Sequence, residues 1–135
     1  MINHIPFAIS CVITGIILFQ SFFIAPSINK LLTTKEASKF LRYIWPVFFI
    51  TISILSMISL IAIYYIGIEQ ITTKYLVIIS FALMSICYFV TPLINNAKDT
   101  SNNQLWKILH LLTVILTLIT LIVNVLIIIY WKFNI

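Results

Sequence analysis

Four long apolar runs constrain what this chain can fold into more strongly than any other feature. Of its 135 residues, 62% are hydrophobic and 8% are charged, whereas a soluble domain carries about 25% charged residues. A run of about 20 apolar residues crosses the hydrocarbon layer of a bilayer as an α-helix. The composition therefore excludes a soluble protein. We predict a single all-α domain over residues 1–135, a polytopic integral membrane protein whose four transmembrane helices cover about residues 5–26, 43–66, 74–93 and 106–131.

Three prolines lie near the ends of these predicted spans. Pro26 is expected to close the first helix and Pro92 the third. Pro46 falls in the first turn of the second helix, where a missing N–H group costs nothing.

The joint between the first two spans is long enough for structure of its own. Thr33 or Thr34 can cap a short helix over residues 34–42, and its basic residues then share one face. We expect an interfacial helix whose amines reach lipid head groups, although a basic loop that only sets topology explains the same pattern. The basic residues on this face are Lys35, Lys39 and Arg42.

Basic residues are divided unevenly between the two sides of the predicted bundle. Six flank the joints after the first and third spans, and two lie on the opposite side. The positive-inside rule places the first side in the cytoplasm and both termini outside it. Seven Lys to one Arg, with abundant Ile and Asn, suggest a bacterial genome rich in A and T, and therefore the inner membrane. Because the charges flank the membrane, we expect the lipid bilayer as partner and no nucleic acid.

Charged residues are missing from the middle of every predicted span. A proton-coupled exporter of the small multidrug type needs a carboxylate within the membrane, and a voltage sensor or a carboxylate di-metal bundle also needs charges there. These classes are excluded. No catalytic constellation is evident, which favours a protein that is not an enzyme.

The fourth span carries a polar stripe with alternating spacings of three and four residues. This spacing keeps one face toward neighbouring helices in a left-handed bundle. Two interpretations stay open, because hydroxyl groups on such a stripe either pack between helices or line a cavity for a ligand. The stripe consists of His110, Thr113, Thr117, Thr120 and Asn124.

His110 is the one residue within a predicted span that can titrate near neutrality or bind a metal. Either it fixes helix register as a structural residue, or it handles a ligand, a metal or a proton. His4 begins the first span at the opposite face, so one chain cannot bring both histidines to a single ion. The cofactor is unknown, and His110 is the only candidate ligand for haem or a metal.

Four stretches occur in a characteristic order: Gly15 to Pro26, Trp45 to Phe49, Pro92 to Asp99, and Trp106 to His110. In this order and spacing the chain resembles the transmembrane protein 205-like family, whose bacterial members form a domain of unknown function. The resemblance implies a four-helix membrane protein with no established reaction. The positions that match the motifs of the family are Gly15, Pro26, Pro46, Pro92 and Asp99.

The chain departs from this family at two places. Asn29 stands where the family usually has an aromatic residue, and Phe48 where it has a tyrosine. A fainter similarity connects such bundles to four-helix membrane proteins that hold haem or copper through histidines, and His110 alone would carry that role here.

Three functions are compatible with these patterns. The favoured one is an accessory subunit or small binding component of the inner membrane. The alternatives are a homo-oligomeric transporter of a neutral or lipophilic solute, and a haem-linked or metal-linked redox protein that uses His110. The corresponding partners are other membrane subunits or further copies of the chain.

Overall fold

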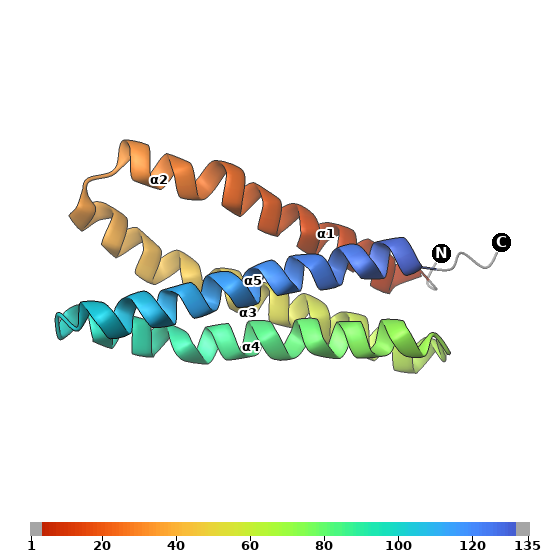
Figure 1. Ribbon diagram of the computed structural model, residues 1–135. Coiled ribbons are helices and arrows are strands. Elements are labelled where there is room, and N and C mark those ends of the chain that lie inside the picture. The colour runs from red at the N-terminus through yellow and green to blue at the C-terminus, as the bar shows by residue number, and fades with distance from the viewer. Residues whose placement is uncertain (1–3, 132–135) are drawn as a thin grey trace.

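The computed structural model describes residues 4–131, which form a bundle of long helices (Figure 1). The elements in chain order are α1 (Ile5–Phe19), the π-helical turn η2 (Gln20–Ile24), α2 (Ala25–Leu31), α3 (Thr34–Ile66), α4 (Ile71–Asp99) and α5 (Asn103–Tyr130). Since α1, η2 and α2 form one continuous rod, four helices are long and apolar enough to cross a membrane. The predicted all-α class and the four spans are confirmed. The left-handed packing stays a prediction.

Every span is longer than predicted, and each extends at the end where the chain is polar. The four rods contain 27 to 33 residues, which correspond to about 40–50 Å, whereas the hydrocarbon layer measures about 30 Å. Apolar runs mark the part of a helix that lies in hydrocarbon. The hydrogen-bonded helix continues beyond that part.

The prolines do not end or begin the helices, so this prediction is wrong. Pro46 and Pro92 lie inside α3 and α4, and the first span continues past Pro26 to Leu31. A proline removes one backbone donor, which a long helix within a bundle tolerates because neighbouring groups and local changes of helix type compensate. At Pro26 that local change is visible. The preceding turn is π-helical, and the N–H of Ala25 donates to the carbonyl of Gln20.

Residues 34–42 are helical but do not form the separate interfacial helix that was predicted. They are the first part of α3, which continues past Arg42 to Ile66 although Pro46 removes one backbone donor. The predicted cap is present at Thr33. Its hydroxyl accepts the N–H of Glu36 at 3.4 Å, and its own N–H donates to the Glu36 carboxylate at 3.0 Å, which is a capping box.

The helices are packed unequally. α4 lies against both α3 and α5 along most of its length, whereas α1 contacts α3 and α5 more sparsely and α2 diverges from the bundle (Figure 1). At the opposite end the beginning of the first span meets the end of the last. There the indole N–H of Trp131 donates to Nδ1 of His4 at 3.1 Å.

Small polar side chains hold α3, α4 and α5 together. The hydroxyls of Ser56 and Ser80 are 3.0 Å apart, and the amide of Asn124 donates to the same Ser80 oxygen at 3.0 Å. A second pair, Ser53 and Ser85, lies at 3.3 Å. Small residues let transmembrane helices approach closely, and hydrogen bonds between them stabilise the contact.

Two apolar clusters complete the core on either side of these bonds. The first consists of Ile13, Ile17, Phe48, Phe49, Ile52, Met84 and Cys87. The second consists of Ile63, Val77, Val123, Ile127 and Trp131.

Candidate functional site

His110 lies in the third turn of α5, within a stack of side chains. Its ring is parallel to that of Trp106, with centroids 5.5 Å apart and an angle of 1° between the planes. On α4, the ammonium of Lys98 lies 4.5 Å from the centroid of the Trp106 ring, a cation–π geometry. The stack joins the end of α4 to the beginning of α5.

Beside His110 a large cavity of about 400 Å³ separates the first span from α3 and α5. Its walls come from α1, η2 and α2 on one side and from α3 and α5 on the other, with no residue of α4 among those that line it within residues 4–131. Most of the lining is apolar. The apolar lining residues are Ile17, Ala25, Ile28, Leu41, Trp45, Phe48, Val114, Leu118 and Leu121, and the polar ones are Gln20, Ser21, Asn29, His110, Thr113 and Thr117.

Gln20 lines this cavity from the π-helical turn and carries an unsatisfied group. Its Oε1 atom is buried and accepts no hydrogen bond. An unpaired amide oxygen costs free energy when it is removed from water. π-Helical turns are frequent at functional sites, because they displace side chains from the regular helical pattern.

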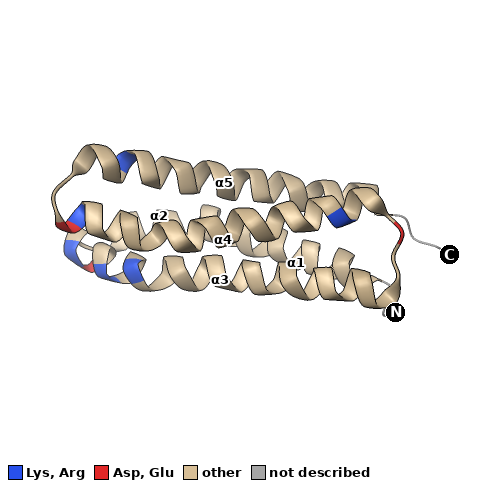
Figure 2. Cartoon of the chain, turned by 90° about the horizontal axis from the view of Figure 1, so that it is seen from below, with Lys and Arg blue, Asp and Glu red and all other residues tan. Residues whose placement is uncertain are grey.

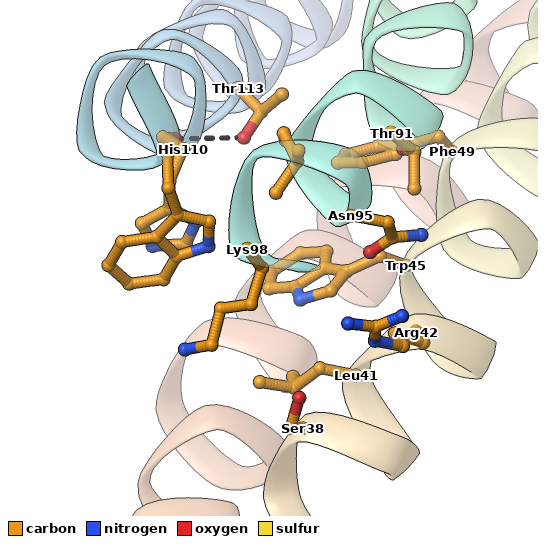
Figure 3. Close-up of a pocket in the computed structure, with 12 residues that line it drawn as sticks. Ser38, Leu41, Arg42, Trp45, Phe49, Thr91, Asn95, Lys98, His110 and Thr113 are labelled. Carbon is orange, nitrogen blue, oxygen red and sulfur yellow. Dashed lines mark hydrogen bonds between the residues drawn. The ribbon is translucent and has the colours of Figure 1, made fainter. Parts of the chain in front are cut away.

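A second, smaller cavity of about 90 Å³ lies between α3, α4 and α5 (Figure 3). Its lining includes two cationic side chains, Arg42 and Lys98, and several uncharged polar ones, among them Ser38 and Asn95. No Asp or Glu is among the lining residues that the described part of the chain contributes. The other lining residues are Leu41, Trp45, Phe49, Thr91, Ile94, Trp106, His110 and Thr113.

The two cavities are adjacent because they share part of their lining. Leu41 and Trp45 of α3 and His110 and Thr113 of α5 belong to both. The arrangement is thus one large apolar chamber next to a small one with cationic walls.

The polar stripe of α5 divides into two parts in the structure. Thr113 and Thr117 line the large cavity. Thr120 and Asn124 are 0% and 1% exposed and are packed inside the bundle. The threonine hydroxyls donate to carbonyls of their own helix at 2.8–2.9 Å, so toward the cavity they offer an acceptor oxygen and a methyl group.

The three basic residues predicted to reach lipid head groups differ in their surroundings. Lys35 and Lys39 are exposed on the first turns of α3. Arg42 forms a bidentate pair with Asp99 at the end of α4, with Nη1 donating to Oδ2 at 3.1 Å and Nη2 contacting Oδ1. Within residues 4–131 this is the only ion pair, and it joins α3 to α4.

Asp99 is therefore the one position of the family resemblance with a specific polar partner. Gly15 is exposed, and a Cβ atom there would meet no heavy atom within 4 Å, so packing does not require a glycine. Pro26 and Pro92 are also exposed.

Sequence reasoning did not single out Lys98, Trp45 or Asn95 as site residues. Each lies near the end of an apolar run, where basic, aromatic and amide residues are expected at a membrane surface in any case. Gln20 does not stand out in the sequence either, because an amide within a span is more often a contact between helices. The signal that points to it is its position six residues before Pro26, which is where the turn widens.

A metal centre is not assembled by the described residues. Residues 4–131 contain no group of three or more His, Cys, Asp or Glu side chains that could hold an ion. His110 lies at the opposite end of the bundle from His4, which contacts Trp131.

Comparison with protein families matches residues 9–103 to a domain of unknown function (DUF4149), which is more than half of the chain. The match ends at the first residue of α5, so it includes Arg42, Lys98 and Asp99, whereas His110 lies beyond it. The searches of curated proteins and of solved structures found no match.

Proposed function

Because this multi-pass membrane protein belongs to the family of the domain of unknown function DUF4149, whose description gives no activity, we propose a function from the geometry of its cavities. The chain is a binding component of the membrane that holds a lipophilic molecule in the large cavity. The observation that carries this proposal is the cavity itself. Its volume of about 400 Å³ falls within the range of ligand sites, about 300–1,000 Å³. Its lining, which is mostly apolar with a few polar groups, is also typical of such sites.

The unequal packing of the helices supports entry from the lipid phase. The cavity separates the first span from α3 and α5, and the first span is also the one with the sparsest contacts to the rest of the bundle. A ligand dissolved in the bilayer reaches the cavity between these helices without crossing water. Gln20 lines this cavity, and its amide oxygen has no hydrogen-bond partner in the structure.

Binding accounts for the structure better than transport does. A transporter needs a path from one face to the other, but the stripe of α5 beyond Thr117 is closed by Thr120 and Asn124, which are almost fully buried. A haem or metal protein needs further ligands near His110, and the described residues provide no such group. The accessory-subunit function remains compatible with ligand binding.

Charge distribution supports the orientation in which the cavities lie in the cytoplasmic half of the bilayer. Lys and Arg gather at one end of the bundle, where α2 ends, α3 begins and α4 meets α5 (Figure 2). By the positive-inside rule this end faces the cytoplasm of a bacterial inner membrane and the termini face outward.

A reporter cysteine at Thr34, in a variant without Cys11 and Cys87, should resist an impermeant reagent in intact cells, whereas one at Gln70 should react. The reverse pattern would invert the orientation.

The closer resemblance to the transmembrane protein 205-like family is also a proposal. It is supported by Asp99, which matches the motif and pairs with Arg42, a lining residue of the small cavity. The resemblance carries no reaction, so the proposed binding function does not depend on it.

Photo-cross-linking tests the binding function directly. A long-chain fatty alcohol that carries a diazirine is incubated with the purified protein in lipid nanodiscs and irradiated. Thr117→Trp fills the large cavity and should abolish the capture. Ile119→Trp adds the same bulk at an exposed position of the same helix and should leave capture unchanged. Equal labelling of both variants would mean that the probe reports only lipid contact, and the proposed function would be wrong.

A further inference from the structure

We propose that the ligand is a single-chain amphiphile with an anionic head group, whose chain occupies the large cavity and whose head lies in the small one beside Lys98. This inference rests on the proposed binding function and adds the chemical class of the ligand. Its basis is that a chamber with apolar walls and a chamber with cationic walls share Leu41, Trp45, His110 and Thr113.

The charge of the small cavity selects the sign of the head group. Arg42 and Lys98 both line it, but the guanidinium of Arg42 is neutralised by its bidentate contact with Asp99. Lys98 has no carboxylate partner within residues 4–131, and its ammonium rests on the Trp106 ring. The chamber therefore carries an uncompensated positive charge, and the head group that balances it is an anion.

Uncharged polar groups around the same chamber fit an anionic head. Ser38 and Asn95, from α3 and α4, also line it (Figure 3). A hydroxyl and an amide each supply donors, which a carboxylate or phosphate accepts in addition to the ammonium. The volume of about 90 Å³ suits a small head group but not the whole of a lipophilic molecule, which directs the chain into the larger chamber.

The two cavities lie along the bundle in the same order as the head group and the chain of a lipid in that leaflet. The small one lies at the end of the bundle where Lys and Arg gather. The large one continues along α5 from His110 to Leu121, a distance of about 16 Å at the rise of an α-helix. A head at the charged end and a chain toward the bilayer centre is the orientation that an amphiphile already has in that leaflet, so no inversion is needed on entry.

A pair of probes with the same chain tests the head group. A long-chain fatty acid with a diazirine is compared with the matching fatty alcohol, in nanodiscs of zwitterionic lipid and in a mildly alkaline buffer that ionises the acid. We expect the acid to be bound about fivefold more tightly, which is the effect of one basic residue on an anionic lipid. Lys98→Gln should remove this preference and Lys98→Arg should retain it. Lys107→Gln, at the same end but outside both cavities, should leave it unchanged.

The outcomes separate this inference from the proposed function. Equal binding of acid and alcohol, both lost in Thr117→Trp, would overturn the anionic head and leave the binding function standing. Absence of capture for both probes would overturn the binding function itself. Competition by acetate or inorganic phosphate alone would indicate a free-anion site, and equal capture of a two-chain phosphatidic acid probe would exclude a single chain. Either result would also overturn the inference.

Discussion

Two parts of this bundle use polar side chains in opposite ways. Between α3, α4 and α5, the hydroxyls of Ser56 and Ser80 and the amide of Asn124 bond to one another in the interior. In the first span, Gln20 lines the large cavity, and its buried Oε1 atom has no hydrogen-bond partner. Polar residues with similar sequence signatures therefore bond to one another in the core of one region and line a cavity in the other.

Enlargement of the tight region should have the largest effect. Ser80 is 1% exposed and contacts both Ser56 and Asn124, so Ser80→Leu should reduce the free energy of unfolding by about 1–3 kcal/mol through overpacking. Unfolding in mixed micelles with increasing dodecyl sulfate measures it. Ala82→Leu, an exposed position of the same helix, is the matched control and should change stability by less than about 0.5 kcal/mol. A similar loss in both variants would show that this interface is not specifically tight.

Removal of the paired amide should have a smaller but measurable effect. Asn124→Ala deletes the hydrogen bonds to Ser80 and to the Thr120 carbonyl and should cost about 1 kcal/mol, as expected for such bonds within a membrane. The same unfolding assay measures the loss, and combination with Ser80→Ala should add less than the sum. Full additivity would mean that the two residues do not interact.

Removal of the unpaired amide should leave stability nearly unchanged. Gln20→Leu deletes a buried acceptor that has no partner, so we expect a change in unfolding free energy below about 0.5 kcal/mol, or a slight gain. Capture of a photoactivatable ligand with a polar end should nevertheless decrease. A substantial loss of stability would place Gln20 in the core and remove the difference between the two regions.

The predictable part of this protein is the part that hydrophobicity determines. The apolar runs predicted the four spans, but the capping box at Thr33 and Glu36 and the continuous helix through Pro46 extend α3 beyond them. Backbone hydrogen bonds continue where hydropathy falls, so the sequence pattern underestimates helix length. The large cavity was not predictable, because it depends on how far the first span diverges from α3 and α5, a distance that no residue spacing specifies. His110, which the sequence singles out as the titratable residue within a span, lines both cavities, whereas Lys98 was hidden among topogenic charges.

The ion pair at the charged end should contribute only a little to stability. Arg42 and Asp99 remain partly exposed to solvent, with side-chain exposures of 39% and 57%, and such pairs contribute little because water and salt screen them. Arg42→Gln should therefore destabilise the bundle less than Asn124→Ala, and high salt should reduce the difference from the unmodified protein. A loss larger than that of Asn124→Ala would show that the joint between α3 and α4, rather than the serine contacts, holds these helices.

The π-helical turn determines which side chains of α2 face the bundle. It contains one more residue per turn than an α-helix, and one residue corresponds to about 100° of rotation around the axis. Ile28, which is buried and lines the large cavity, faces the bundle only in this phase. Deletion of one residue from Gln20–Ile24 would let this turn become α-helical and would keep α2 in the same phase, whereas insertion of one residue would rotate the inner face of α2 by about 100° toward lipid. The number of residues between Gly15 and Pro26 is therefore a structural quantity in itself, independent of which apolar residues fill the interval.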